Sequence, residues 1–203
     1  MQPRHDLVTH RRMALKATIY KAKLQIADLD RGYYADHALT LARHPSETDE
    51  RLLVRLAAFA LNANDTLAFG KGLSTDDEPD LWARDLTGAI DHWIDVGLPD
   101  ERRVRKAAGR ARQVTVYAYG DHNVQVWWDG ARDAIGRPAN ARVIRLPGAS
   151  TKALAALAVR TMALSCTIQD GSLWLGDGGQ TVEVMPEVLY LPSDRSHSGR
   201  TRS

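Results

Sequence analysis

The sequence predicts an α/β protein, α+β in the order of its segments, with a central mixed β-sheet flanked by helices. Segments of alternating polar and apolar residues, which predict strands, are interrupted by segments with apolar residues at helical spacing. The 203 residues are 44% hydrophobic, enough to bury one full core. We therefore expect a single domain over residues 13–191, with disordered polar segments at 1–12 and 192–203.

The first expected element is an N-terminal β-hairpin that adds to the central sheet. Residues 15–26 alternate with a period of two and include β-branched side chains, which favours a strand. Residues 28–32 have the composition of a turn, and residues 33–42 form the returning strand.

A helix is predicted next, with Ser46 as its N-cap. Apolar residues at helical spacing follow and end near residues 62–64. With Leu56 at the centre of the buried face, Glu50 falls on the flank of that face and Glu47 on the far side of the helix. Glu50 can therefore face a cleft, although an acid in a first helical turn also simply suits the helix dipole.

An acidic run that ends in Pro79-Asp80 precedes two further strands. A short strand begins at Leu81, and residues 89–96 form an alternating strand on which Asp91 and Asp95 share one face. Two carboxylates on one strand face indicate a functional site, or else the solvated face of a half-exposed sheet.

A basic helix follows these strands. Asp100 is a suitable N-cap, and residues 101–112 combine a narrow apolar stripe with a strongly basic face. A basic helix face is suited to phosphate groups, so a nucleic-acid partner is expected along it. The side chains expected to make this contact are Arg102, Arg103, Arg105, Lys106 and Arg110.

The rest of the chain completes the sheet and its cover. Residues 114–120 are β-branched and aromatic, as in a buried strand. A helix is predicted from Ser150 or Thr151 to Met162. The remaining predicted strands are residues 124–128, 141–146, 166–169, 173–175 and 181–185.

Composition excludes several classes of protein. The formal net charge of +2 leaves only local patches for an anionic partner. The single cysteine, Cys166, excludes an internal disulfide and a multi-cysteine zinc site, and its apolar neighbours predict a buried thiol. The first twelve residues lack the apolar segment of a secretory signal, and no segment is apolar for long enough to span a bilayer. We expect a cytoplasmic protein with no membrane partner.

Asp80 and Asp95 are the strongest candidates for a catalytic site. Converging carboxylates repel one another, and a hard divalent cation such as Mg²⁺ or Mn²⁺ relieves the repulsion. Such an ion activates water and polarises a phosphoryl oxygen, while a nearby lysine stabilises the charge that develops. Lys106 is the candidate lysine, and Asp91 is an alternative to Asp95.

Several segments together resemble the YaeQ family of bacterial proteins. The likeness extends from about residue 13 to 191 and is carried by MALKATIYKAKLQIADLDRGYY, LTLARHPSETDERLLVRLAAFALNA, KGLSTDDEPDLW, WIDVGLPDERRVRKA and CTIQDG. The resemblance implies a variant of the PD-(D/E)xK nuclease-like fold, also called restriction endonuclease-like. In that superfamily the site consists of a Glu on the first core helix, a Pro-Asp on one strand and an acid-x-Lys on the next.

The resemblance assigns roles to three acids. Glu50 resembles the helix acid, Pro79-Asp80 the Pro-Asp element and Asp95 the acid of the next strand. It thus implies a metal set of Glu50, Asp80 and Asp95 that holds Mg²⁺ or Mn²⁺.

The chain departs from the superfamily at Gly97, which stands where the lysine is expected. The resemblance implies that Lys106 is a migrated catalytic cation and that Gln113 is a further polar group of the site. Two functions follow. The first is a divalent-metal-dependent nuclease that hydrolyses phosphodiester bonds in nucleic acid. The alternative is a catalytically inactive nuclease-like scaffold that binds nucleic acid or a protein partner.

Overall fold

The computed structural model describes residues 17–71 and 77–192, so the predicted disordered segments lie outside the described residues, apart from Pro192. Within these ranges the elements are β1 (Thr18–Asp28), β2 (Tyr33–Arg43), α1 (Asp49–Asn62), β3 (Leu67–Phe69), β4 (Leu81–Arg84), β5 (Ile90–Val96), α2 (Glu101–Ala108), β6 (Ala111–Ala118), α3 (His122–Ile135), β7 (Ala141–Arg145), α4 (Gly148–Leu154), the 3₁₀ helix η1 (Ala155–Leu157), β8 (Thr161–Gln169), β9 (Ser172–Gly176), β10 (Thr181–Val184) and β11 (Glu187–Tyr190). The α/β class is confirmed. No helix in the described ranges is both long enough and apolar enough to cross a membrane.

The strands form two mixed sheets, where the sequence predicted one central sheet. Sheet A has the order β10-β9-β8-β1-β2, and sheet B has the order β11-β7-β6-β5-β4-β3. The predicted N-terminal hairpin is confirmed as β1 and β2, which pair antiparallel, while β1 also pairs in parallel with β8 from the far end of the chain. A period of two identifies a strand but not its distant partner, which is why the division into two sheets was missed.

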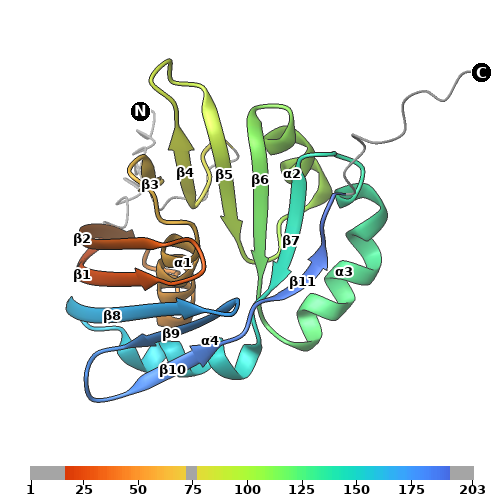
Figure 1. The fold of residues 1–203 in the computed structure, drawn as a ribbon. Helices are drawn as coiled ribbons and strands as arrows, with labels where there is room; N and C mark the ends of the chain where they lie inside the picture. The colour runs from red at the N-terminus through yellow and green to blue at the C-terminus, as the bar shows by residue number, and fades with distance from the viewer. Residues whose placement is uncertain (1–16, 72–76, 193–203) are drawn as a thin grey trace, which may run out of the picture.

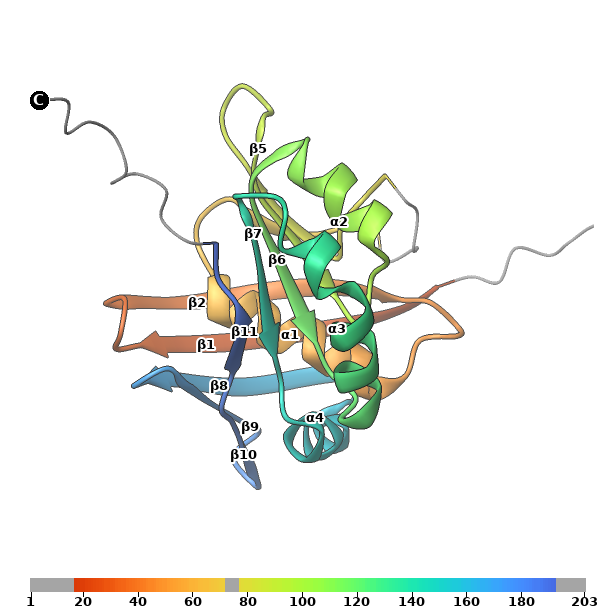
Figure 2. The same ribbon diagram turned by 90° about the vertical axis from the view of Figure 1, so that its right-hand side faces the viewer.

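Helix α1 lies between the two sheets, as Figures 1 and 2 show. Every residue from Leu52 to Ala60 is buried, so the helix has no solvated side over this stretch. Leu24 of sheet A, Leu56 of α1 and Ile94 of sheet B belong to one apolar cluster. The main core is therefore built around this one helix.

A second apolar cluster covers the other face of sheet B. Helices α2 and α3 lie over this face (Figure 2). Val104 of α2 and Ile135 of α3 join Trp93, Val114 and Val116 of the sheet in this cluster. Sheet B is consequently covered on both faces, by α1 on one and by α2 with α3 on the other.

Several local predictions were correct in kind but differ in extent. Helix α1 begins at Asp49, and its N-cap is Thr48, whose hydroxyl accepts a hydrogen bond from the Arg51 amide, in place of Ser46. The predicted helix from Ser150 or Thr151 ends earlier, because the chain passes through η1 and returns as β8 from Thr161. The predicted buried thiol is confirmed, and burial followed by the nearby Asp28 raises the pKa of Cys166 to about 12.

One predicted strand was wrong. Residues 124–128 belong to α3, not to a strand. Val124, Trp128, Ala131 and Ile135 recur at helical spacing and pack together against sheet B. A five-residue window was too short to separate the two periods, and it contained both tryptophans of the helix. The short strands β3 and β11 were not predicted at all.

The burial of α1 predicts that its central leucine dominates stability. Leu56 is 0% exposed, whereas Leu86 in the β4–β5 turn is fully exposed. Leu56→Ala should lower the free energy of unfolding by about 2–5 kcal/mol because it leaves a cavity between the sheets. Leu86→Ala should change it by less than about 0.5 kcal/mol. Urea denaturation of both variants measures this, and equal effects would contradict the central position of α1.

Candidate functional site

A charged pocket of about 270 Å³ lies where β4 begins and β5 ends. Its lining residues are Arg51, Asp80, Asp95, Val96, Gly97, Leu98, Pro99 and Arg103. β4 and β5 pair antiparallel with Leu81 opposite Ile94, so the residue before Leu81 meets the residue after Ile94. Strand register therefore brings Asp80 and Asp95 together, as the sequence predicted for these two residues.

Asp80 is held by two strong hydrogen bonds. Its Oδ1 accepts from Arg51 Nη2 at 2.7 Å, and its Oδ2 accepts from the backbone amide of Val96 at 2.7 Å. The first bond ties the carboxylate to α1 and the second ties it to β5. The orientation of this carboxylate is thereby fixed from both sides of the pocket.

Asp95 is buried rather than solvated, with 2% of its surface exposed. Arg103 of α2 donates to both of its oxygens, from Nε at 2.9 Å and from Nη2 at 2.7 Å. Burial raises the pKa of Asp95, and Asp80 adds to the rise, while Arg103 opposes it. The alternative of a solvated strand face is wrong for this residue. Asp91 is the acid nearer solvent, and it lies 2.8 Å from Arg112 outside the pocket.

A chain of ion pairs runs from the core to the pocket. Arg55, 0% exposed, lies 2.9 Å from Glu47, and Glu47 in turn accepts from Arg51 at 3.0 Å. Arg51 then reaches Asp80. Burial lowers the pKa of Arg51, but Asp80 and Glu47 more than offset it, so the pKa is raised and the guanidinium stays charged.

The sequence-based position of Glu47 was wrong. We expected it on the far side of the helix, but it is 6% exposed and faces Arg51 and Arg55. It precedes the N-cap Thr48, so helical spacing does not apply to it. Arg51 and Arg55 are four residues apart, so the sequence could show that they share one side of the helix, but not that Glu47 faces them.

The other predicted site residues do not line this pocket. Glu50 accepts a 2.7 Å hydrogen bond from Thr151 of α4, and Lys106 donates at 2.7 Å to Asp77. Gln113 pairs in register with His92 and therefore points to the opposite face of sheet B from Asp95. It lines a separate hollow of about 430 Å³.

Glu50 and the pocket acid Asp80 nevertheless both affect the pKa of one residue, Tyr119. Burial raises the pKa of Tyr119, and the charges of Glu50 and Asp80 raise it further, while Arg51 lowers it. The charges of both acids therefore act on this half-buried tyrosine. Nothing in the sequence singled out Tyr119.

Gly97 has a conformational reason to be glycine. Its φ of +108° lies in the region that side chains rarely adopt, and its amide donates to the Tyr117 carbonyl at 2.9 Å. A Cβ at this position would meet nothing within 4 Å. The backbone conformation, rather than lack of space, therefore disfavours a lysine here.

Carboxylate oxygens are donors that a hard cation accepts, and the pocket has two carboxylates. Mg²⁺ is usually held by one or two carboxylates together with water and substrate phosphates, so Asp80 and Asp95 could suffice. Among the residues that the structure describes, no group of three or more His, Cys, Asp or Glu side chains is arranged to hold a metal ion. A cation at Asp80 and Asp95 would also have to displace the guanidinium groups that now contact them.

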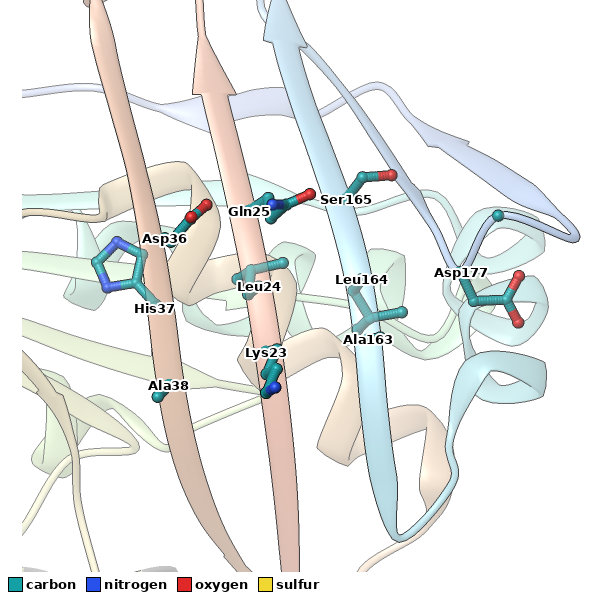
Figure 3. Close-up of a pocket in the computed structure, with 11 residues that line it drawn as sticks. Lys23, Leu24, Gln25, Asp36, His37, Ala38, Ala163, Leu164, Ser165 and Asp177 are labelled. Carbon is teal, nitrogen blue, oxygen red and sulfur yellow. The ribbon is translucent and has the colours of Figure 1, made fainter.

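A larger open hollow of about 570 Å³ lies on sheet A, away from these acids. Figure 3 shows Gln25, Asp36 and Ser165 among its lining residues, with Asp177 at its side. Glu50, Asp80, Asp95, Lys106 and Gln113 are not among the residues that line it. Its lining also includes Lys23 and His37, and it is separate from the acid–arginine pocket.

The geometry so far defines an α/β protein of two mixed sheets, with an acid–arginine pocket at the end of two neighbouring strands. The chain belongs to the YaeQ family, since the family model described as YaeQ protein matches residues 13–186. The protein described as "Uncharacterized protein YaeQ" from Escherichia coli (strain K12) is 47% identical over 181 residues, which are 89% of this chain and 100% of that protein. The protein of the same description from Salmonella typhi is 46% identical over the same shares.

Two solved structures of the family have the same fold. The crystal structure of YaeQ protein from Xanthomonas axonopodis pv. citri has a TM-score of 0.83 and 55% identity, and covers 87% of this chain and 99% of its own. That of YaeQ protein from Pseudomonas syringae has a TM-score of 0.82 and 38% identity, and covers 86% of this chain and 96% of its own.

The buried ion pairs predict a large cost for removing Glu47. Glu47→Gln leaves Arg55 buried without its carboxylate, so the free energy of unfolding should fall by about 3–5 kcal/mol. Glu183→Gln, at an exposed strand position, should change it by less than about 0.5 kcal/mol. Chemical denaturation of the two variants makes the comparison, and a small loss for Glu47→Gln would show that the chain of ion pairs does not support α1.

His92 should make stability depend on pH. Burial, followed by the charge of Arg142, lowers its pKa from 6.5 to about 4, and its Nε2 lies 2.8 Å from Thr115 Oγ1. As the pH falls, His92 is protonated in the unfolded chain near pH 6.5 but in the folded protein only near pH 4. The free energy of unfolding should therefore fall by up to about 3 kcal/mol between pH 6.5 and about 4. Unfolding curves between pH 4 and 7 test this against His92→Gln. A constant difference between the two proteins across that range would contradict a buried neutral His92.

Proposed function

We propose that this protein is a divalent-metal-dependent nuclease that hydrolyses phosphodiester bonds in nucleic acid. The observation that carries the proposal is the meeting of Asp80 and Asp95 in one open pocket with Arg51 and Arg103. Carboxylates beside guanidinium groups can serve a cation and a phosphate at the same place. Apolar packing does not require two acids from neighbouring strands in one pocket, and neither does an exposed ion pair.

The order of elements supports a distant relation to the PD-(D/E)xK nuclease-like fold. A helix with acids at its start, a Pro-Asp at the start of β4 and an acid near the end of β5 follow one another in the chain. Residues 79–80 and Asp95 keep the superfamily's order, and Gly97 departs from it. In this proposal Arg51 and Arg103 provide the positive charge that the lysine provides elsewhere.

The residues that would hold Mg²⁺ or Mn²⁺ are Asp80 and Asp95, whereas Glu50 is bonded to Thr151 and does not line the pocket. When bound, such an ion supplies positive charge for a phosphoryl oxygen and lowers the pKa of a coordinated water. The chain's own contribution is orientation. The Val96 amide holds Asp80, Glu47 holds Arg51, and the pocket wall at Pro99 is held by a 2.8 Å hydrogen bond from Trp127.

The outer surface of α2 supports a nucleic-acid substrate. Arg102, Arg105 and Lys106 of α2 are exposed, as is Arg110, which follows the end of the helix at Ala108, whereas Arg103 turns into the pocket. Lys106 and Arg110 also contact Asp77, so they are partly neutralised by it. A basic surface next to the pocket would retain the phosphate backbone by charge, independently of base sequence.

Nuclease activity tests the proposal directly. The protein should cleave single- or double-stranded DNA or RNA with Mg²⁺ or Mn²⁺, and Asp80→Asn and Asp95→Asn should lower the rate by about 100-fold or more. Asp91→Asn is the matched control, because Asp91 lies on the same strand face but outside the pocket, and its rate should stay within about threefold of the parent's. Activity that survives both pocket substitutions would refute this site.

A scaffold without catalytic activity is the second candidate, and one observation favours it. Both acids already have arginine partners at 2.7 Å, and two ion pairs with a purely structural role would have the same geometry. The same assay separates the two functions. Binding of nucleic acid without cleavage under any metal would leave the scaffold as the function.

A further inference from the structure

We infer that Arg51 and Arg103 are exchangeable partners of the pocket acids, and that a divalent cation transfers them from the carboxylates to a substrate phosphate. This inference rests on the proposed cation site and states how that site is loaded. It makes cation binding and phosphate binding cooperative. It also assigns the phosphate contacts to these two arginines, in place of Lys106.

The balance of charge in the pocket supports the exchange. Arg51 and Arg103 are its cationic lining residues, and Asp80 and Asp95 are its anionic ones, so two positive charges cancel two negative charges. A pocket without net positive charge does not attract the negative charge of a phosphodiester. A divalent cation at the acids gives the pocket an excess of two positive charges, and the released guanidinium groups can then face the anion.

The second requirement is that each arginine keeps its place when it leaves its acid. Arg51 donates from Nη1 to Glu47, which is itself held by the fully buried Arg55. This contact does not involve Asp80, so it persists when the cation takes Asp80. Arg51 is anchored at one end and exchangeable at the other.

Arg103 has a comparable arrangement. Besides its two bonds to Asp95, it donates from Nη2 to the Glu78 carbonyl at 2.9 Å, and its guanidinium lies 6.0 Å from the Trp93 ring centre. These contacts keep the side chain at the pocket after Asp95 has changed partner. A guanidinium is planar and can bind two phosphate oxygens at once, which suits it to receive the phosphate.

Lys106 lacks this arrangement. Its ammonium contacts Asp77, its side chain is 42% exposed, and it does not line the pocket. It belongs to the outer basic surface of α2, where it can attract a nucleic acid without touching the bond to be cleaved. Arg105, exposed on the same helix, provides the matched control for an arginine that is near the pocket but outside it.

Binding measurements with Ca²⁺ test the inference, because they do not depend on cleavage. A fluorescein-labelled 12-nucleotide single-stranded DNA is titrated with and without Ca²⁺, and the affinity for Ca²⁺ alone is measured by calorimetry. In the parent protein Ca²⁺ should strengthen DNA binding by about tenfold or more. Arg51→Gln and Arg103→Gln should lose this enhancement, yet bind Ca²⁺ alone at least as tightly as the parent, since the carboxylates are then less shielded. Arg105→Gln should keep the enhancement.

Each other outcome overturns the inference. In the first, Ca²⁺ does not strengthen DNA binding by the parent protein. In the second, Arg51→Gln and Arg103→Gln both retain the strengthening. In the third, these two variants lose Ca²⁺ binding as Asp80→Asn does. The proposed nuclease activity fails separately. If the binding results are as expected but no cleavage occurs in Mg²⁺ or Mn²⁺, the arginine exchange stands and the nuclease activity is refuted. If cleavage occurs but Ca²⁺ strengthens DNA binding equally in the parent and the arginine variants, the activity stands and the exchange is refuted.

Discussion

The buried contact between Glu47 and Arg55 is the interaction on which the rest of the molecule depends. It joins the residue before the N-cap of α1 to the middle of that helix, which lies between the two sheets, and both partners are almost completely removed from solvent. A charge in that position requires a counter-charge, because burial of an unpaired ion costs several kcal/mol. The pair therefore fixes the start of α1 in one place. Arg51, one turn from Arg55, is thereby held at the mouth of the pocket.

The pocket follows from the same constraint and from strand register. Antiparallel pairing of β4 and β5 brings Asp80 beside Asp95, and the ends of α1 and α2 each contribute an arginine. Four elements thus meet around two carboxylates. Under the proposed function this convergence positions the groups, and the arginines balance the acids until a cation arrives. The backbone conformation of Gly97 disfavours a lysine at that position, so the positive charges of the pocket come from Arg51 and Arg103 on the helices.

The sequence contained enough information for the local elements and for the acids. The period of two in β1 and β2 and the helical spacing in α1 are properties of neighbouring residues, so they could be read directly. Asp80 and Asp95 could be paired because they belong to a local hairpin. What could not be predicted depends on distant contacts, namely the separation into two sheets and the contact of Arg51 with Asp80. Residues 124–128 show the opposite difficulty, since a window shorter than two helical turns cannot distinguish helix from strand.

The central claim is that Asp80 and Asp95 receive a divalent cation and release their arginines. A crystal structure with Mn²⁺, located by its anomalous scattering, tests this most directly. One anomalous peak is expected at oxygens of both carboxylates, with Arg51 still bonded to Glu47 but no longer to Asp80, and Arg103 moved away from Asp95. If saturating Mn²⁺ leaves both acid–arginine contacts intact, or binds elsewhere, Asp80 and Asp95 are not the cation site.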